Sequence, residues 1–217
     1  MENAKKNISI FNLFISSVYL MEKPEFLDVA KKVTKKYLDQ RKDIEELNPN
    51  FPSYMTENIF SDVDMLDISK FISQAAWEIL DNQGYDMKNI QTYFTEMWVQ
   101  EHHKGSVMDR HIHGNGSIIS GFYFLECPEN SKVIFHDLRD AKVITSLPEK
   151  DVSSPTSASN MIHFDVKDGM LMFTNSWLPH SFSKNIEEKP FTFIHFNIAA
   201  APIQISNTVC RPNVEIV

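Results

Sequence analysis

Histidines are the residues of this sequence whose type and spacing can do chemistry. All eight lie from His102 onward, seven of them up to His180 and the eighth at His195. His111 and His113 are two residues apart, so in a β-strand both imidazoles point to the same face and can bind one metal ion. His180 lies far along the chain and is the candidate for the third ligand. The spacing predicts a metal centre of three histidines.

The elements that must position these histidines are short β-strands separated by turn residues. The predicted runs are 91–100, 107–113, 117–125, 132–136, 169–173 and 191–199. Strands of this length and spacing are typical of a jelly roll or barrel. The polar stretch 140–160 predicts a long loop between two of the strands.

The region before the strands has a different pattern. Residues 8–20 are rich in β-branched and aromatic side chains, which predicts one or two strands. Apolar residues at spacings of three and four predict a helix over 25–47. A second helix is expected from a cap at Asp67 or Ser69 through Leu80, with Gly84 as its stop. These helices are expected to support the β core.

Composition limits the classes of protein. The chain has 217 residues and 42% hydrophobic content, which predicts one domain over 1–217, with a support region at 1–88 and a β core at 89–217. A net charge of -8 disfavours nucleic acid as a partner. Cys127 and Cys210 are too few for a disulfide framework. With no segment expected to span a membrane, we expect a soluble, cytoplasmic protein.

Two blocks of sequence carry a family resemblance. The first block contains Trp98, Gly105, His111-Ile-His113-Gly-Asn-Gly-Ser117 and Ser120-Gly121-Phe-Tyr123-Phe124-Leu125. The second is a strand that starts at Gly169 and leads to His180, followed by a last strand that ends in Phe196-Asn197. Together with the early strand and the two helices, these blocks resemble the 2OG-Fe(II) oxygenases found in marine bacteria and their phages. If the chain is phage-encoded, the expected location is the host cytoplasm.

The resemblance implies a mainly β fold with flanking helices, in which a double-stranded β-helix packs against two or more N-terminal helices. It implies that Fe(II) and 2-oxoglutarate convert O₂ and a substrate C–H bond into a hydroxylated product, succinate and CO₂. By position, His111 and His180 match metal ligands, and His113 occupies the place of a carboxylate in the wider superfamily. Three outcomes stay open: ligation by His113, a water as third ligand, or a carboxylate such as Asp109 or Asp137. We favour His113.

The co-substrate's distal carboxylate needs a cation, and arginine suits it best. The family pattern leads us to expect arginine at the start of the last strand, where this sequence has Lys189. Lys189 is the candidate, with a solvated turn as the alternative interpretation and Arg139 as a second choice. Ser120 and Tyr123 are further candidates, although residues of opposite parity in a strand face opposite ways. Asn197 completes the predicted co-substrate residues.

Two other functions remain as alternatives at this point. A three-histidine cupin-type metalloenzyme that does not use 2-oxoglutarate would explain the missing carboxylate and the missing arginine. A jelly-roll binding protein without turnover would keep only the fold. The expected substrate is a small molecule or a protein side chain, and a homo-oligomer stays open.

Overall fold

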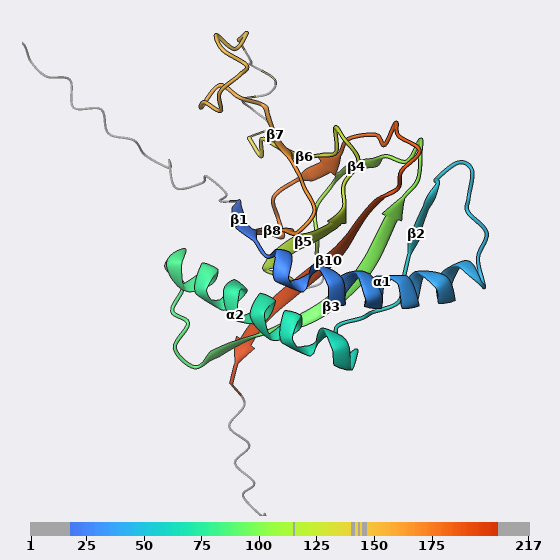
Figure 1. Cartoon of the computed structure of the whole chain (residues 1–217). Helices are drawn as coiled ribbons and strands as arrows, with labels where there is room; N and C mark the ends of the chain where they lie inside the picture. The colour runs from blue at the N-terminus through green and yellow to red at the C-terminus, as the bar shows by residue number, and fades with distance from the viewer. Residues whose placement is uncertain (1–17, 115, 140–141, 143, 145–146, 204–217) are drawn as a thin grey trace, which may run out of the picture.

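The computed structural model describes residues 18–203, apart from positions 115, 140, 141, 143, 145 and 146. Two antiparallel sheets form its centre (Figure 1). The six-stranded sheet has the order β1 (Tyr19–Glu22), β8 (Met170–Asn175), β5 (Ile119–Glu126), β10 (Phe191–Pro202), β3 (Ile90–His102) and β2 (Ser53–Met55). The four-stranded sheet has the order β4 (Met108–His111), β9 (His180–Phe182), β6 (Lys132–His136) and β7 (Met161–Asp165).

Two helices cover the outer face of the larger sheet (Figure 1). They are α1 (Leu27–Lys42) and α2 (Leu66–Asn82), and each follows a single 3-10 turn, Pro24–Phe26 and Val63–Met65. No helix of the described chain is long and apolar enough to cross a membrane. The predicted fold class, a double-stranded β-helix flanked by N-terminal helices, is confirmed.

Alternation along β5 explains how one strand serves two cores. Tyr123 and Leu125 face the helices and are buried with them, whereas Phe122 and Phe124 face the interior between the sheets. Gly121 on the helix side has no room for a side chain, because an added Cβ would lie 2.3 Å from the Phe196 ring. The helices therefore pack on one face while the other face is free to line a site.

The helix bounds differ from the predictions in two respects. The first helix ends at Lys42 instead of 47. Ile44, just past its end, is 78% exposed, so continuing the helix through this residue would bury little apolar surface there. Neither predicted cap is used at the second helix. Asp62 accepts a hydrogen bond from the backbone of Asp64 ahead of the 3-10 turn. The glycine stop is confirmed, since Gly84 has φ of +93° just past the helix.

Most predicted strands are present, with shifts of a few residues at their ends. Three strands were not predicted: β2, β7 and β9, of three to five residues each. β2 and β9, with three residues each, are too short for alternation to be recognisable in sequence. Most of the predicted strand segment 8–20 lies outside the described residues, and β1 begins at Tyr19, near the end of that segment. Between β6 and β7 the described positions contain no strand, as expected for a long loop.

Candidate metal centre

The three predicted histidines come together at one end of the interior. β4 and β9 are paired so that His111 lies opposite His180. His113 lies just beyond β4, where its backbone N–H donates to the Ser176 carbonyl at 2.9 Å. The ligand atoms of the three rings all lie within 4.8 Å of one another, and no other group of three or more potential ligands is found in the described part of the chain.

Backbone carbonyls orient two of the rings. His111 Nδ1 lies 2.7 Å from the Asp109 carbonyl, and His180 Nδ1 lies 3.0 Å from the Leu178 carbonyl. A carbonyl oxygen only accepts, so each Nδ1 donates its proton and each Nε2 is left with a lone pair. The Nε2 atoms of His113 and His180 are 3.2 Å apart. This is the arrangement that a metal ion bound through Nε2 requires.

Burial keeps the rings of His113 and His180 neutral. It lowers the pKa of His113 to about 4, with a smaller contribution from the charge of His111. It lowers the pKa of His180 to about 3 for the same two reasons. Neutral imidazole is the ligating form, and imidazole suits iron as well as zinc, copper and nickel. The residues present therefore fit a divalent metal ion at neutral pH.

Asn197 is the centre of a hydrogen-bond network behind His113. Its Oδ1 accepts from the Ser120 hydroxyl at 2.6 Å and lies 3.2 Å from His195 Nε2. Its Nδ2 donates to Glu96 Oε2 at 2.8 Å and lies 3.5 Å from His113 Nδ1. Ser120 and Asn197, two of the predicted co-substrate residues, are thus bonded to each other behind His113.

Sequence reasoning missed Glu96 and His195. His195 is fully buried, and its ring stacks on His113 with centroids 4.4 Å apart. Only the parity of the last strand pointed to it, because His195 shares a face with Asn197. Nothing in the local sequence distinguishes Glu96 from the other acidic residues. It is recognised only when β3 is paired with β10.

The alternative carboxylate ligands lie outside the histidine group. Asp109 contributes its backbone carbonyl to His111, as described above, and its carboxylate is not among the clustered ligand atoms. Asp137 is held by Arg139 and Lys142, with Arg139 Nη2 at 2.7 Å. This ion pair also occupies Arg139, the second candidate for the co-substrate.

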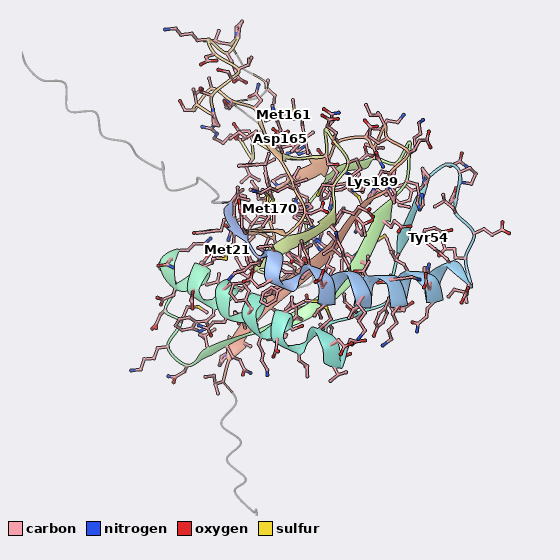
Figure 2. The ribbon with its side chains drawn as sticks, viewed as in Figure 1. Met21, Tyr54, Met161, Asp165, Met170 and Lys189 are labelled. Carbon is pink, nitrogen blue, oxygen red and sulfur yellow. The ribbon has the colours of Figure 1, made fainter. Side chains whose placement is uncertain are left out.

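Two predicted co-substrate residues point away from the histidines. Tyr123 faces the helices, and its hydroxyl donates to the Lys23 carbonyl at 2.6 Å. Lys189 lies at the start of β10, with its side chain 49% exposed and its Nζ 3.5 Å from Glu126 (Figure 2). Strand parity predicted an inward Lys189, but Pro190 separates it from the strand, which begins at Phe191. Among the described residues, no lysine or arginine is buried.

The interior beyond the histidines is aromatic. Phe122, Phe124, Phe182, Phe191 and Phe193 are all buried in one cluster between the sheets. Phe173 packs instead with the helices, because it has the opposite parity on β8, and Trp177, in the turn after β8, is 41% exposed. A wall of this kind excludes water from the metal-facing side.

His102 is the polar group of this aromatic interior. It stacks on Phe193 with centroids 5.5 Å apart. Its Nδ1 pairs with the Ser106 hydroxyl at 2.7 Å and its Nε2 with Gln100 Oε1 at 3.0 Å. Burial lowers its pKa to about 4, so the ring is neutral. His102 is therefore a satisfied core histidine.

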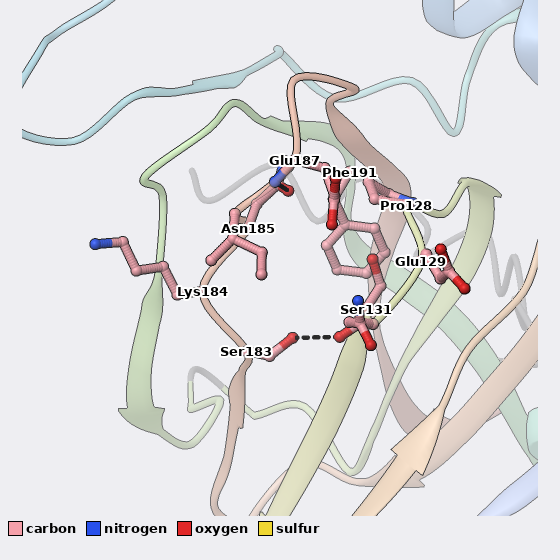
Figure 3. A pocket seen from close by; sticks show the side chains of 10 residues that line it. Pro128, Glu129, Ser131, Ser183, Lys184, Asn185, Glu187 and Phe191 are labelled. Atoms are coloured by element: carbon pink, nitrogen blue, oxygen red, sulfur yellow. Dashed lines mark hydrogen bonds between the residues drawn. The ribbon is translucent and has the colours of Figure 1, made fainter.

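Two hollows lie away from the histidines. One lies between the β5–β6 and β9–β10 connections, with Phe191 and Ser131 on its wall (Figure 3). Its volume of about 10 Å³ holds roughly one water. The other is a groove of about 370 Å³ beside α1, lined by Lys35, Leu38 and Leu125 among others. Neither is bordered by a histidine of the metal centre.

Comparisons with known proteins bear on the family and on the fold. A family model described as "Putative 2OG-Fe(II) oxygenase" matches residues 96–197, which contain all three histidines and the Asn197 network. The family depends on Fe(II) and 2-oxoglutarate. No curated protein sequence matches the chain.

Solved structures with the same fold are remote in sequence. HygX from Streptomyces hygroscopicus, with nickel and 2-oxoglutarate bound, has 10% identity and a TM-score of 0.56 over 89% of this chain and 87% of its own. A Pseudomonas putida prolyl-4-hydroxylase has 15% identity and a TM-score of 0.52, over 85% of this chain and 94% of its own. EctD from S. alaskensis has 12% identity and a TM-score of 0.60, over 85% of this chain and 73% of its own. At this identity the likeness shows the fold.

The family match over residues 96–197 and the fold together support an enzyme, an oxidoreductase. The three-histidine cluster lies within the matched residues. The marine or phage origin expected from the resemblance stays a prediction.

Proposed function

We propose that this chain is a dioxygenase that hydroxylates a C–H bond of its substrate and releases succinate and CO₂, with the metal held by His111, His113 and His180. The observation that carries the proposal is the convergence of the three rings, whose ligand atoms lie within 4.8 Å of one another. Three ligands on one side of a metal ion leave positions for a 2-oxo acid and for O₂. Fe(II) bound there, with the co-substrate, supplies the oxidising chemistry.

The chain's own residues contribute positioning. The carbonyls of Asp109 and Leu178 hold two rings with Nε2 inward. Asn197, itself held by Glu96, packs behind the third ring, with its Nδ2 3.5 Å from His113 Nδ1. The buried phenylalanines keep water from the reacting atoms.

The two ends of the co-substrate meet different surroundings. Its 2-oxo acid end would bind the metal that His111, His113 and His180 would hold. Its distal carboxylate finds no buried cation in the described interior, and Lys189 is paired with Glu126 at the surface. Lys189 serves this carboxylate only if the pair with Glu126 opens. The substrate itself is a small molecule or a protein side chain.

A three-histidine enzyme that does not use 2-oxoglutarate is the second candidate. The specific observation in its favour is the absence of a buried lysine or arginine among the described residues. Succinate formation separates the two candidates. Purified protein is incubated with Fe(II), ascorbate, O₂ and 2-oxoglutarate, and succinate is measured with and without metal. Metal-dependent succinate supports the dioxygenase, and its absence with iron bound supports the second candidate.

The ligand assignment is tested by His180→Ala. The variant is expected to lose stoichiometric Fe(II) while its circular dichroism stays that of the wild type. His163→Ala is the matched control, because His163 is exposed on β7 and is not in the cluster. Stoichiometric iron retained in His180→Ala contradicts the assignment.

A further inference from the structure

The indole N–H of Trp98 is a buried donor without a partner. Its Nε1 is shielded from solvent and makes no hydrogen bond. The other two tryptophans are satisfied: Trp77 Nε1 donates to the Ile90 carbonyl at 2.9 Å, and Trp177 is 41% exposed. An unpaired buried N–H destabilises a fold by about 1–3 kcal/mol. Such a group therefore requires an explanation.

Trp98 lies beside the metal centre. It is paired with His195 across β3 and β10, and the two rings are 4.5 Å apart at their centroids. His195 in turn stacks on His113. Trp98 also shares the inward face of β3 with Glu96, which is bonded to Asn197. The indole is thus one ring away from a candidate metal ligand.

The other unpartnered buried groups lie elsewhere. Thr34, Arg41 and Ser53 are on α1 and β2, and Thr192 borders the groove beside α1. Trp98 is the unpartnered donor next to the histidines in the described chain. A ligand that binds at the metal and brings an acceptor oxygen would satisfy it.

The chemistry of the interior defines that ligand. No lysine or arginine of the described chain is buried, so apart from the metal ion an anion bound in the interior depends on neutral donors there. A carboxylate oxygen is the strongest acceptor that a 2-oxo acid offers, and a hydrogen bond to it is charge-assisted. We propose that the Trp98 indole N–H donates a hydrogen bond to a carboxylate oxygen of the 2-oxo acid co-substrate. This assignment rests on the proposed function.

Trp98→Phe tests the assignment, because phenylalanine keeps an aromatic face against His195 and removes only the donor. The iron-loaded protein is titrated anaerobically with 2-oxoglutarate, and the weak visible charge-transfer band is followed. We expect Fe(II) affinity to stay within about twofold and the dissociation constant for 2-oxoglutarate to rise about tenfold or more, as for a lost charge-assisted hydrogen bond. Trp77→Phe is the matched control, because it also loses an indole N–H but lies far from the histidines on α2.

A second measurement does not depend on how the variant folds. In zinc-substituted wild-type protein labelled with ¹⁵N-tryptophan, the Trp98 indole resonance is expected to shift downfield when 2-oxoglutarate is added. The Trp77 resonance is expected to stay in place.

The outcomes separate the two proposals. If Trp98→Phe gives the wild-type band with the wild-type dissociation constant for 2-oxoglutarate, the role of Trp98 is overturned and the proposed function stands. An unmoved Trp98 resonance in the wild type leads to the same conclusion. Iron binding without any band in the wild type overturns both.

Discussion

Removing the Glu96 carboxylate is expected to weaken metal binding, although Glu96 is not a ligand. Glu96 Oε2 accepts from Asn197 Nδ2 at 2.8 Å, and Asn197 packs behind the ring of His113. In Glu96→Ala the Asn197 Nδ2 loses its acceptor, so the packing behind His113 loosens. Outer partners of metal-binding histidines typically change metal affinity by about 10–100-fold. We expect a loss in this range.

The assay is anaerobic competition for Fe(II), or Co(II) as a probe, against a chromophoric chelator. Glu96→Gln keeps an acceptor oxygen for Asn197 and is expected to recover most of the affinity. Glu57→Ala is the control for loss of a glutamate, because the Glu57 side chain is 88% exposed. The visible spectrum of bound Co(II) should change in Glu96→Ala, since that spectrum reports ligand geometry. Wild-type affinity and an unchanged Co(II) spectrum in Glu96→Ala refute the reasoning.

Two further predictions concern stability. His102 has a folded pKa of about 4 and an unfolded value near 6.5, so the unfolded chain binds the extra proton between these values and stability is lost as the pH falls from about 6.5 towards 4. The loss approaches roughly 3 kcal/mol, and urea unfolding at several pH values should show a smaller acid dependence in His102→Asn. Tyr123→Phe removes the hydrogen bond to the Lys23 carbonyl and should cost about 1 kcal/mol of unfolding free energy. Its Fe(II) affinity should equal that of the wild type, and a loss of iron binding would mean that Tyr123 acts at the metal.

The histidine cluster could be predicted because its signals are local. The two-residue spacing of His111 and His113 is visible in sequence, and both lie in a run that was predicted as a strand. The reason given, that both histidines lie in one strand, was partly wrong. β4 ends at His111, so His113 reaches the site from a turn beyond the strand, held by the Ser176 carbonyl.

The surroundings of the cluster could not be predicted, because they depend on strand register. Glu96 and Asn197 are 101 residues apart and meet only when β3 and β10 pair. Lys189 was predicted to point inward by continuing the alternation of β10 back past Pro190. The strand begins only at Phe191, so the alternation does not reach Lys189. The unpaired indole N–H of Trp98 results from packing, and no sequence pattern predicts it.

The central claim is a metal centre that binds 2-oxoglutarate. Its most direct test is anaerobic titration of the purified protein with Fe(II) and then with 2-oxoglutarate, in the wild type and in His111→Ala. The account predicts a weak visible charge-transfer band in the wild type that is absent from the variant. Iron bound at one equivalent without a band would contradict the use of 2-oxoglutarate, and no iron binding would contradict the metal centre itself.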